Sequence, residues 1–396
     1  MIPKYKPYAG LSELLSLLDC EGNVVERFEQ AFAAAVGSKY ALAFPYGRSG
    51  LLALLESQGI RGAEVLIPAY TCIVVPNAIL ASGNIPRFVD IRLDNYNMDI
   101  GIVPSAMSGQ TRAIVPAHMY GYPLDVKQLR DAVGDDHVLV FEDACLAVLS
   151  RDVGSYSDAA FYSLNLGKQL TTFDGGIVTT NHEHIYESLR SHRETRFTRT
   201  SLGTRLKKAI MLAASEVIFK EAVYGLVYAV WKRSGRVRSR TRNWSLSDTG
   251  MPKDYLESYS GVQARVGLAQ LRKLDEIVKR RKEIAGLYDQ RLAGVEDLVL
   301  PPIAEGATYS HYTVRTRDRE GLVKALERRG IQAGSTFDYS IPHTAAYALY
   351  AGEGRFPNSA AAAREIVNLP VYPSLSRAAA EAVCDIVLDW TARRDD

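Results

Sequence analysis

Two residues that could cooperate in catalysis stand in one stretch of the chain, residues 138–181. Asp143 closes an apolar run that is typical of a buried strand, and ligands bind at the carboxyl ends of such strands in open α/β sheets. Lys168 follows 25 residues later, in a short polar turn between a strand and a glycine-containing hairpin. Taken alone, Asp143 could cap a helix and Lys168 could be a solvated surface lysine. Together they supply a carboxylate and an amine, a pair with a specific chemical use.

That use is the chemistry of pyridoxal 5'-phosphate (PLP). A lysine amine forms a Schiff base with PLP, and a carboxylate keeps the pyridine nitrogen protonated so that the ring withdraws electrons. Lys168 and Asp143 meet these two needs. The phosphate needs hydroxyl groups and free backbone N–H groups, which a helix N-terminus provides. Ser163, Asn165 and the loop of residues 46–50, which opens a helix, can supply them.

The loop of residues 46–50 reads Tyr-Gly-Arg-Ser-Gly. Gly47 lets the backbone approach an anion, Arg48 adds positive charge, and Ser49 adds a hydroxyl and an N–H group. An ordinary glycine turn that caps the following helix explains the same residues equally well.

Short apolar runs alternate with helical stretches from Tyr40 onward, after an amphipathic helix over residues 24–36. Several runs are continuously apolar, as expected for strands buried on both faces. This pattern predicts an α/β fold with a mostly parallel sheet flanked by helices. The expected strands are residues 65–68, 87–91, 113–116, 138–142, 159–163 and 176–180.

The last part of the chain has a different pattern and predicts a smaller α+β domain. We expect a large domain over residues 1–290 and a small one over 291–396, joined by a long helix over about residues 262–293. The elements expected in the small domain are a strand at residues 309–316, a helix at 319–329 and a last helix from about residue 376.

Composition limits the class of protein further. The 396 residues, 47% of them hydrophobic, suffice for two domains with separate cores. A net charge of +2 does not favour nucleic acid as a partner. The four cysteines are widely spaced, without metal-site or disulfide spacing, and residues 1–8 lack the apolar run of a signal peptide. We therefore expect a cytoplasmic protein.

One insertion, at about residues 203–250, is unusual. Residues 205–231 form a mostly apolar helical run, and residues 232–242 follow with six basic residues and no acid. Charges at Glu216, Lys220 and Glu221 argue against a membrane-spanning helix. Two interpretations remain: an amphipathic helix at a membrane surface, with peripheral contact through residues 205–242, or a segment packed on the protein or at a subunit contact.

The order of the motifs resembles the sugar aminotransferases of the DegT/DnrJ/EryC1/StrS family, over nearly the whole chain outside residues 203–250. The matching pieces are EVLIPAYTCIVVPNAILASGNIPRFVDI, AIVPAHMYGYPLD, FEDACLA, FYSLNLGKQLTTFDGGIVTTN, VQARVGLAQLRKLDEIVKRRKEIAGLYDQRL and VNLPVYPSL. The resemblance implies the fold-type I PLP transferase fold and a homodimer with its site between subunits. It also implies transfer of an amino group, usually from glutamate, to a keto-sugar nucleotide in polysaccharide or natural-product biosynthesis.

The resemblance also implies roles for individual residues. Lys168 would form the Schiff base and move the proton, Asp143 would hold the pyridine nitrogen, and Ser163 would bind the phosphate. His343 occupies a loop position where family members approach the sugar.

The chain departs from the family at three places. Leu146 stands where a glutamine usually touches the ring hydroxyl of the cofactor. Cys72 stands where an aromatic ring often stacks on it, for which Tyr70 could compensate. The run YLESYSGVQARVG lacks the asparagine that usually reaches the partner's phosphate, and Arg48 or Asn243 could substitute.

Further candidates and functions stay open. His118 is a core histidine or a substrate-binding residue, and Tyr5 and Tyr8 could line the site. The departures at Leu146 and Cys72 keep open a PLP enzyme of another class, a dehydratase, a lyase or a carbon–carbon bond-forming enzyme. A non-catalytic regulatory homologue is a third possibility, although retention of the carboxylate and the amine speaks against it.

Overall fold

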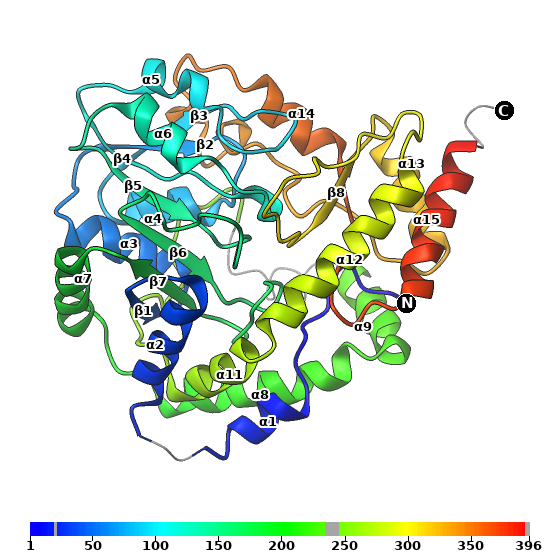
Figure 1. Ribbon diagram of the computed structural model, residues 1–396, viewed down its shortest axis with the longest axis horizontal. Helices are drawn as coiled ribbons and strands as arrows, with labels where there is room; N and C mark the ends of the chain where they lie inside the picture. Colours follow the sequence, from blue (N-terminus) through cyan, green and yellow to red (C-terminus); the bar gives the residue numbers. More distant parts are fainter. Residues whose placement is uncertain (20–21, 234–244, 393–396) are drawn as a thin grey trace.

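The centre of the molecule is a seven-stranded sheet in the order β1-β7-β6-β5-β4-β2-β3, seen in a computed structural model that describes residues 1–19, 22–233 and 245–392 (Figure 1). Strands β2 to β6 pair in parallel, whereas β7 runs antiparallel to both β1 and β6. The predicted α/β fold with a mostly parallel sheet is confirmed. The strands are β1 Tyr40–Phe44, β2 Glu64–Pro68, β3 Ile85–Val89, β4 Thr111–Ile114, β5 Leu139–Asp143, β6 Ala159–Ser163 and β7 Gly176–Thr180.

The strands are buried because helices cover the sheet. Helix α3 is the most enclosed of them, with every residue from Gly47 to Leu55 buried. This burial explains why its sequence is apolar nearly all round. The longer helices of this part are α2 Val24–Val36, α3 Gly47–Ser57, α4 Val74–Ala81, α6 Val126–Val133, α7 Glu183–Arg196 and α11 Gly261–Leu271.

A second sheet of two antiparallel strands, β8 and β9, lies in the C-terminal part of the chain. Helix α12 runs toward it, and α13 and α15 lie beside it (Figure 1). The arrangement fits a smaller α+β unit, while the boundary at residues 290/291 stays a prediction. The elements are α12 Leu274–Leu292, β8 Tyr312–Arg315, α13 Arg319–Arg328, α14 Pro357–Glu365, β9 Ile366–Leu369 and α15 Arg377–Ala392.

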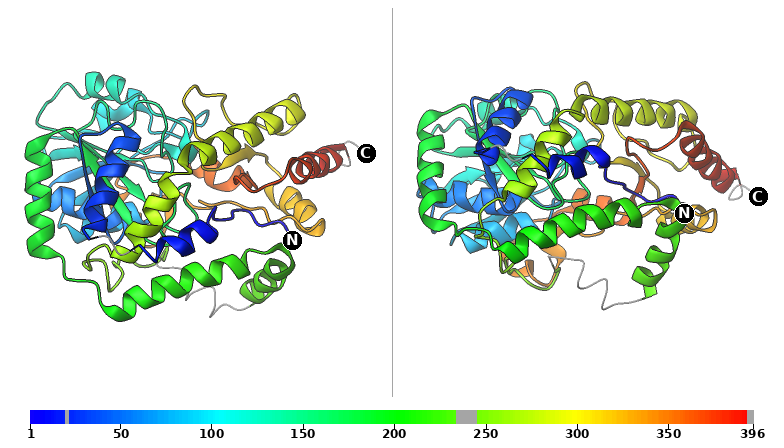
Figure 2. Two further views of the ribbon diagram at one scale, coloured as in Figure 1. Left: turned by 60° about the horizontal axis from the view of Figure 1, so that its bottom comes forward. Right: turned by 90° about the horizontal axis from the view of Figure 1, so that it is seen from below.

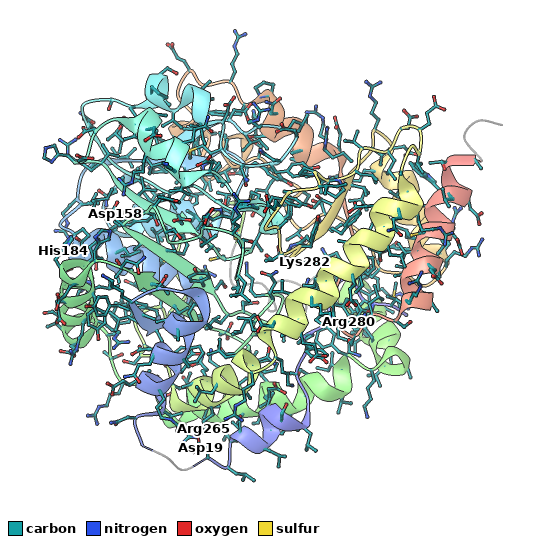
Figure 3. The ribbon with its side chains drawn as sticks, viewed as in Figure 1. Asp19, Asp158, His184, Arg265, Arg280 and Lys282 are labelled. Atoms are coloured by element: carbon teal, nitrogen blue, oxygen red, sulfur yellow. The ribbon has the colours of Figure 1, made fainter. Side chains whose placement is uncertain are left out.

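The single helix expected over residues 262–293 is wrong, because α11 ends at Leu271 and α12 begins at Leu274. At the break, Lys273 pairs with the buried carboxylate of Glu13, with Nζ to Oε1 at 2.8 Å. Glu13 belongs to the short helix α1 (Leu11–Ser16). The turn after α1 contacts α11, because Arg265 of α11 donates to the carbonyl of Asp19 (Figure 3). A long-range ion pair therefore fixes the break.

The apolar run of residues 205–231 forms two helices, α8 (Leu202–Ile218) and α9 (Glu221–Arg233), not one. Helix α8 lies beside α1 and α11, and α9 turns toward the N-terminal arm and the C-terminal part (Figure 2). Among the described residues, no helix is long and apolar enough to cross a bilayer. The basic residues 234–242 and Asn243 lie outside the described part of the chain.

Candidate active site

Asp143 occupies the last position of β5 and is buried. Its Oδ1 accepts a hydrogen bond from the N–H of Cys145 at 3.0 Å. Burial raises the pKa of Asp143, while the Cys145 N–H and the positive charge of Lys168 act in the opposite direction. A buried carboxylate of this kind is stabilised by a positively charged N–H partner.

Lys168 lies in the turn that joins β6 to β7, where its backbone N–H donates to Asn165 O at 2.9 Å. No hydrogen bond or ion pair of the amine is found within the described ranges. The charge of Lys168 lowers the pKa of both Asp143 and His311, so the amine lies within electrostatic reach of both. The two residues that the sequence pairs are therefore brought together.

The turn that carries Lys168 is held from outside by helix α8. Lys208 of α8 forms an ion pair with Asp174 Oδ2 at 2.8 Å, and Asn165 donates to the other oxygen, Oδ1, at 3.1 Å. Phe173 packs with Leu212 of α8 in a small apolar cluster. Helix α8 thus supports the turn, which agrees with the packed interpretation of the apolar run at residues 205–231.

The N-terminus of α3 meets the end of β6 at Gly47. A Cβ atom there would lie 3.3 Å from Ser163 Cβ and 3.3 Å from Cys145 Sγ. The first N–H groups of a helix have no intrahelical acceptor, so α3 offers them close to Ser163. Arg48 is buried beside them, with its guanidinium 5.5 Å from the Tyr46 ring centroid. Gly47, Arg48 and Ser163 therefore gather at one point.

Ser49 and Asn165 are bound to the protein itself. Ser49 Oγ donates to the carbonyl of Tyr255 at 2.7 Å, and the Asn165 amide donates to Asp174. The Ser49 N–H also has a partner, the carbonyl of Tyr46 at 3.1 Å. Contact of Ser49 and Asn165 with the phosphate therefore stays a prediction.

Gly176, the first residue of β7, packs directly under this helix N-terminus. A Cβ atom at Gly176 would lie 2.3 Å from Gly47 N and 2.5 Å from Gly47 Cα. At these distances the backbone of one of the two segments would have to shift. We expect Gly176→Ala to lower the free energy of unfolding by about 2–3 kcal/mol. Urea unfolding measures this, and Gly286→Ala, with open space on a helix, is the control. Equal stability of the two variants would contradict the close packing.

Cys72 and Leu146 are the two predicted departures from the family near the cofactor, and contact of either side chain with PLP stays a prediction. Cys72 influences the pKa of Arg48 and of Cys145, which puts the thiol among these residues. Leu146 is buried in the main hydrophobic core. Neither side chain offers the aromatic ring or the amide that the family usually has there.

Tyr70 and His118 are bound within the protein. Tyr70 is buried, and its hydroxyl donates to Phe337 O at 2.9 Å. Because its one proton is used there, the Tyr70 hydroxyl accepts from the Tyr120 hydroxyl, 2.7 Å away. The Nδ1 atom of His118 accepts the N–H of Leu124, which leaves Nε2 to donate to Glu142 Oε2 at 2.6 Å. This geometry favours a structural histidine, and substrate contact by either side chain stays a prediction.

His343 is exposed, with its ring centroid 6.3 Å from that of Phe356. The segment just before it docks on the turn after β2, because Ile341 N donates to Ala69 O and Ile73 N donates to the Tyr339 hydroxyl. Substrate contact by His343 therefore stays a prediction, supported only by the position of this loop.

The N-terminal arm reaches the candidate site through Tyr5. Two of its ring carbons would lie 3.9 Å from a Cβ atom at Gly167, next to Lys168. Tyr8 lies further along, where its hydroxyl donates to Glu276 at 2.8 Å. Of the two tyrosines, the structure brings Tyr5 to the turn that carries Lys168.

His311, which the sequence does not single out, lies close to Lys168. Its pKa is lowered well below the usual value, first by burial and then by the positive charges of Lys4, Lys168 and Arg281. The ring centroid lies 5.4 Å from that of Tyr120, and Nδ1 lies 3.1 Å from Ser310 Oγ. The imidazole is therefore neutral at neutral pH.

The lowered pKa of His311 predicts a pH-dependent stability. The unfolded chain takes up the proton more readily than the folded one, so stability is complete above about pH 6.5 and falls as the pH drops below it. The slope from this residue is at most about 1.4 kcal/mol per pH unit. Denaturant titrations between about pH 7 and pH 5 give the free energy of unfolding of the PLP-free wild type and of His311→Gln. The difference between their pH slopes is the contribution of His311. Identical slopes would show that His311 is not responsible.

These groups fit PLP by their chemistry. Asp143 is a buried acceptor in need of a positive partner, and the Lys168 amine forms no hydrogen bond or ion pair within the described residues. Gly47 leaves space that a side chain would fill, beside Ser163 and the buried Arg48. A cation, a hydroxyl and backbone N–H groups together suit a phosphate.

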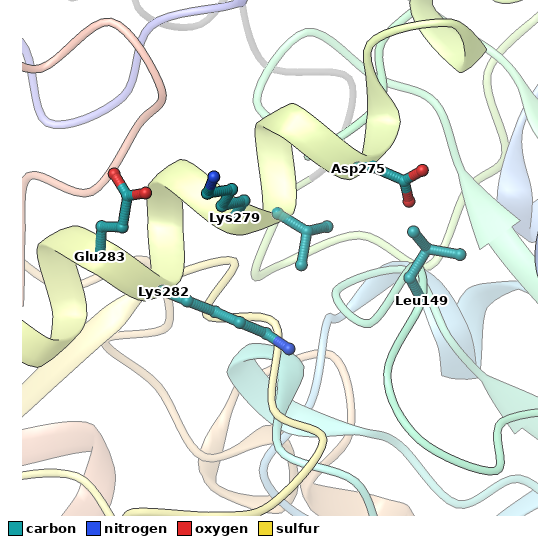
Figure 4. Close-up of a pocket in the computed structure, with 6 residues that line it drawn as sticks. Leu149, Asp275, Lys279, Lys282 and Glu283 are labelled. Atoms are coloured by element: carbon teal, nitrogen blue, oxygen red, sulfur yellow. The ribbon is translucent and has the colours of Figure 1, made fainter.

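A cleft of about 580 Å³ lies elsewhere, on the outer side of α12 near Leu149 (Figure 4). Lys279 and Lys282 line it together with Asp275 and Glu283, so its charges are balanced. Asp143 and Lys168 do not line this cleft, and it is not the candidate active site.

A lysine follows β6, a carboxylate ends the neighbouring strand β5, and a helix N-terminus lies beside both. Together these features define a PLP-dependent transferase. The sequence matches the DegT/DnrJ/EryC1/StrS aminotransferase family over residues 15–215 and 229–388, and the chain belongs to this family. It is therefore a PLP-dependent aminotransferase, as the resemblance predicts.

Relatives of the chain agree with this assignment. It is 29% identical to dTDP-3-amino-3,4,6-trideoxy-alpha-D-glucose transaminase of Streptomyces venezuelae, over 94% of this chain and 89% of the relative. It is 24% identical to GDP-perosamine synthase of Vibrio cholerae, over 98% and 99%. The structure of the aminotransferase TlmJ from Streptoalloteichus hindustanus superposes with a TM-score of 0.79 at 26% identity, covering 100% of both chains.

Proposed function

We propose that this protein transfers an amino group from glutamate to the keto group of a nucleotide-linked sugar. The observation that carries the proposal is the convergence of Lys168 and Asp143 at the carboxyl edge of the sheet. The names of the relatives, a dTDP-linked sugar transaminase and a GDP-linked sugar synthase, support a nucleotide-linked substrate. The product would serve polysaccharide or natural-product biosynthesis.

The residues divide the work by their chemistry. PLP, when bound, withdraws electrons from the substrate carbon attached to the transferred nitrogen. Asp143 would hold a proton on the ring nitrogen, and its burial would make that ion pair strong. Lys168 Nζ would bind the cofactor and carry a proton to and from the reacting carbon. Ser163, Arg48 and the N-terminus of α3, which lie close together, would hold the phosphate.

A homodimer with the site between subunits is part of the proposal. Sedimentation velocity of the PLP-loaded protein tests it and is expected to give twice the chain mass. A monomer with full activity would remove this part and leave the chemistry of Lys168 and Asp143 untouched.

The amino donor is tested in a half-reaction. Glutamate added to the PLP-loaded protein is expected to convert the visible absorption of lysine-bound PLP into the near-ultraviolet absorption of pyridoxamine phosphate. Alanine and glutamine serve as comparison donors. A spectrum that no amino donor changes would overturn the proposal of amino transfer.

A second candidate function rests on Leu146 and Cys72. Leucine and cysteine at these positions would leave the ring hydroxyl and one ring face without the contacts that the family usually supplies. A dehydratase, a lyase or a carbon–carbon bond-forming reaction on the same scaffold is therefore the alternative. The half-reaction separates the two functions, since only amino transfer leaves the cofactor as pyridoxamine phosphate.

A further inference from the structure

Helix α8 is buried on one side and carries exposed apolar residues on the opposite side. One side packs on the protein, and its residues Lys208, Leu212, Ser215 and Phe219 are buried at a spacing of four, three and four. The other side carries Leu206, Ile210 and Val217, exposed to 64%, 58% and 54%. A helix that packs on one side normally turns polar residues to water on the other. The outer side of α8 therefore lacks the residues that water would favour.

Helix α9 repeats this pattern. Its inner side carries tyrosines that tie it to α13, where Tyr228 donates to Glu327 at 2.8 Å and Tyr224 donates to the nearby Gln332 at 2.7 Å. Its outer side carries Leu226, exposed to 71%, and Val230, exposed to 51%. We call Leu206, Ile210, Val217, Leu226 and Val230 the outer apolar surface.

The neighbouring helix α1 extends the same kind of surface. Leu14 and Leu17 turn inward to the cluster that α8 shares, whereas Leu15 and Leu18 remain exposed. Figure 2 shows α1 and α8 running side by side along one side of the molecule in both views. Exposed apolar residues on adjacent helices exceed the scattered exposure that is normal for a water-facing surface.

The charge of this segment indicates what covers it. Residues 202–233 contain six basic and two acidic residues, whereas the whole chain has a net charge of only +2. Two of the six, Lys208 and Lys232, are paired with Asp174 and Glu327, which leaves four basic residues for other contacts. Lys220 stands exposed at the turn between α8 and α9, and Arg233 is exposed at the end of α9. Apolar residues flanked by basic ones match a bilayer with anionic headgroups.

Part of the outer apolar surface lies outside the ranges that match the family. The family match stops at residue 215 and resumes at residue 229, so Val217 and Leu226 fall between the matched ranges. The other three residues, Leu206, Ile210 and Val230, fall within them.

We propose that the outer apolar surface of α8 and α9 binds this aminotransferase to an anionic lipid bilayer as a peripheral protein. Leucine, isoleucine and valine side chains enter the boundary between headgroups and acyl chains, and the basic residues contact the phosphates. The proposal is independent of the substrate and of the proposed reaction.

Vesicle sedimentation of the PLP-loaded full chain tests this. Wild type is expected to pellet with vesicles of phosphatidylglycerol and phosphatidylcholine, more weakly with phosphatidylcholine alone, and less as salt rises. The double variant Ile210→Glu/Leu226→Glu is expected to bind the anionic vesicles at least about tenfold more weakly. The control Ile303→Glu/Leu349→Glu, at residues exposed to 85% and 96%, is expected to bind as wild type does.

Three results would overturn the proposal. Wild type could fail to pellet with anionic vesicles, or both double variants could bind equally well. The third is that Ile210→Glu/Leu226→Glu changes the sedimenting mass in solution, which would show that a second copy covers this surface. Circular dichroism and the visible absorption of bound PLP establish that both variants are folded, so a loss of binding reports on the surface.

Discussion

Replacing Lys168 by alanine is expected to remove the visible absorption of lysine-bound PLP and to slow the half-reaction with glutamate by at least about 10²–10⁴-fold. The amine has two tasks, since it binds the cofactor and moves the proton, and alanine can do neither. The fold is expected to survive, because the turn is held by Asn165, Asp174 and Lys208 and not by the Lys168 side chain. Stopped-flow absorption with glutamate measures the rate.

The control for this loss is Lys324→Ala, which removes an exposed lysine of α13 paired with Glu320. It is expected to keep both the absorption and the rate. Rescue of Lys168→Ala by added methylamine would assign the lost rate to the missing amine. A Lys168→Ala variant that reacts with glutamate at the wild-type rate would contradict the account.

Asp143→Asn is expected to separate cofactor attachment from chemistry. Asparagine can still accept the N–H of Cys145, so the neighbouring backbone keeps its place, and Lys168 remains free to bind PLP. The negative charge that holds the ring nitrogen protonated is lost, so we expect the half-reaction to slow by about 10²–10³-fold. Absorption spectra report attachment, and stopped flow with glutamate reports the rate.

This change is not expected to weaken the fold. Burial raises the pKa of Asp143, so the carboxylate is costly where it lies, and a neutral amide removes that cost. The matched control is Asp94→Asn at an exposed ion pair with Arg92, which should change neither measurement. A wild-type rate in Asp143→Asn would show that this carboxylate does not hold the ring nitrogen.

The strands could be predicted because their burial on both faces leaves a continuous apolar run. Strands β6 and β7 have the expected bounds, while β5 is displaced by one residue. The two helix breaks could not be predicted, because neither Arg272–Lys273 nor Phe219–Lys220 contains glycine or proline. The first break depends on the ion pair of Lys273 with Glu13, 260 residues away.

The site could be predicted only where its chemistry is local in sequence. Asp143 and Lys168 end and follow neighbouring strands, so their pairing follows from the order of the strands. His311 stands just before β8, far along the chain from Lys168, and a single histidine there gives no signal in the sequence. Ser49 shows the opposite case, because its hydroxyl is bound by Tyr255, 206 residues away, which no local pattern reveals.

Borohydride reduction followed by peptide mass spectrometry tests whether Lys168 is the lysine that binds PLP, because reduction makes a bond between PLP and a lysine permanent. We expect the phosphopyridoxyl group on Lys168 alone. Lys208, which lies near Tyr46 and pairs with Asp174, is the nearby lysine against which the result is judged. The label on Lys208, or a PLP-saturated protein without any labelled lysine, would contradict the assignment of Lys168.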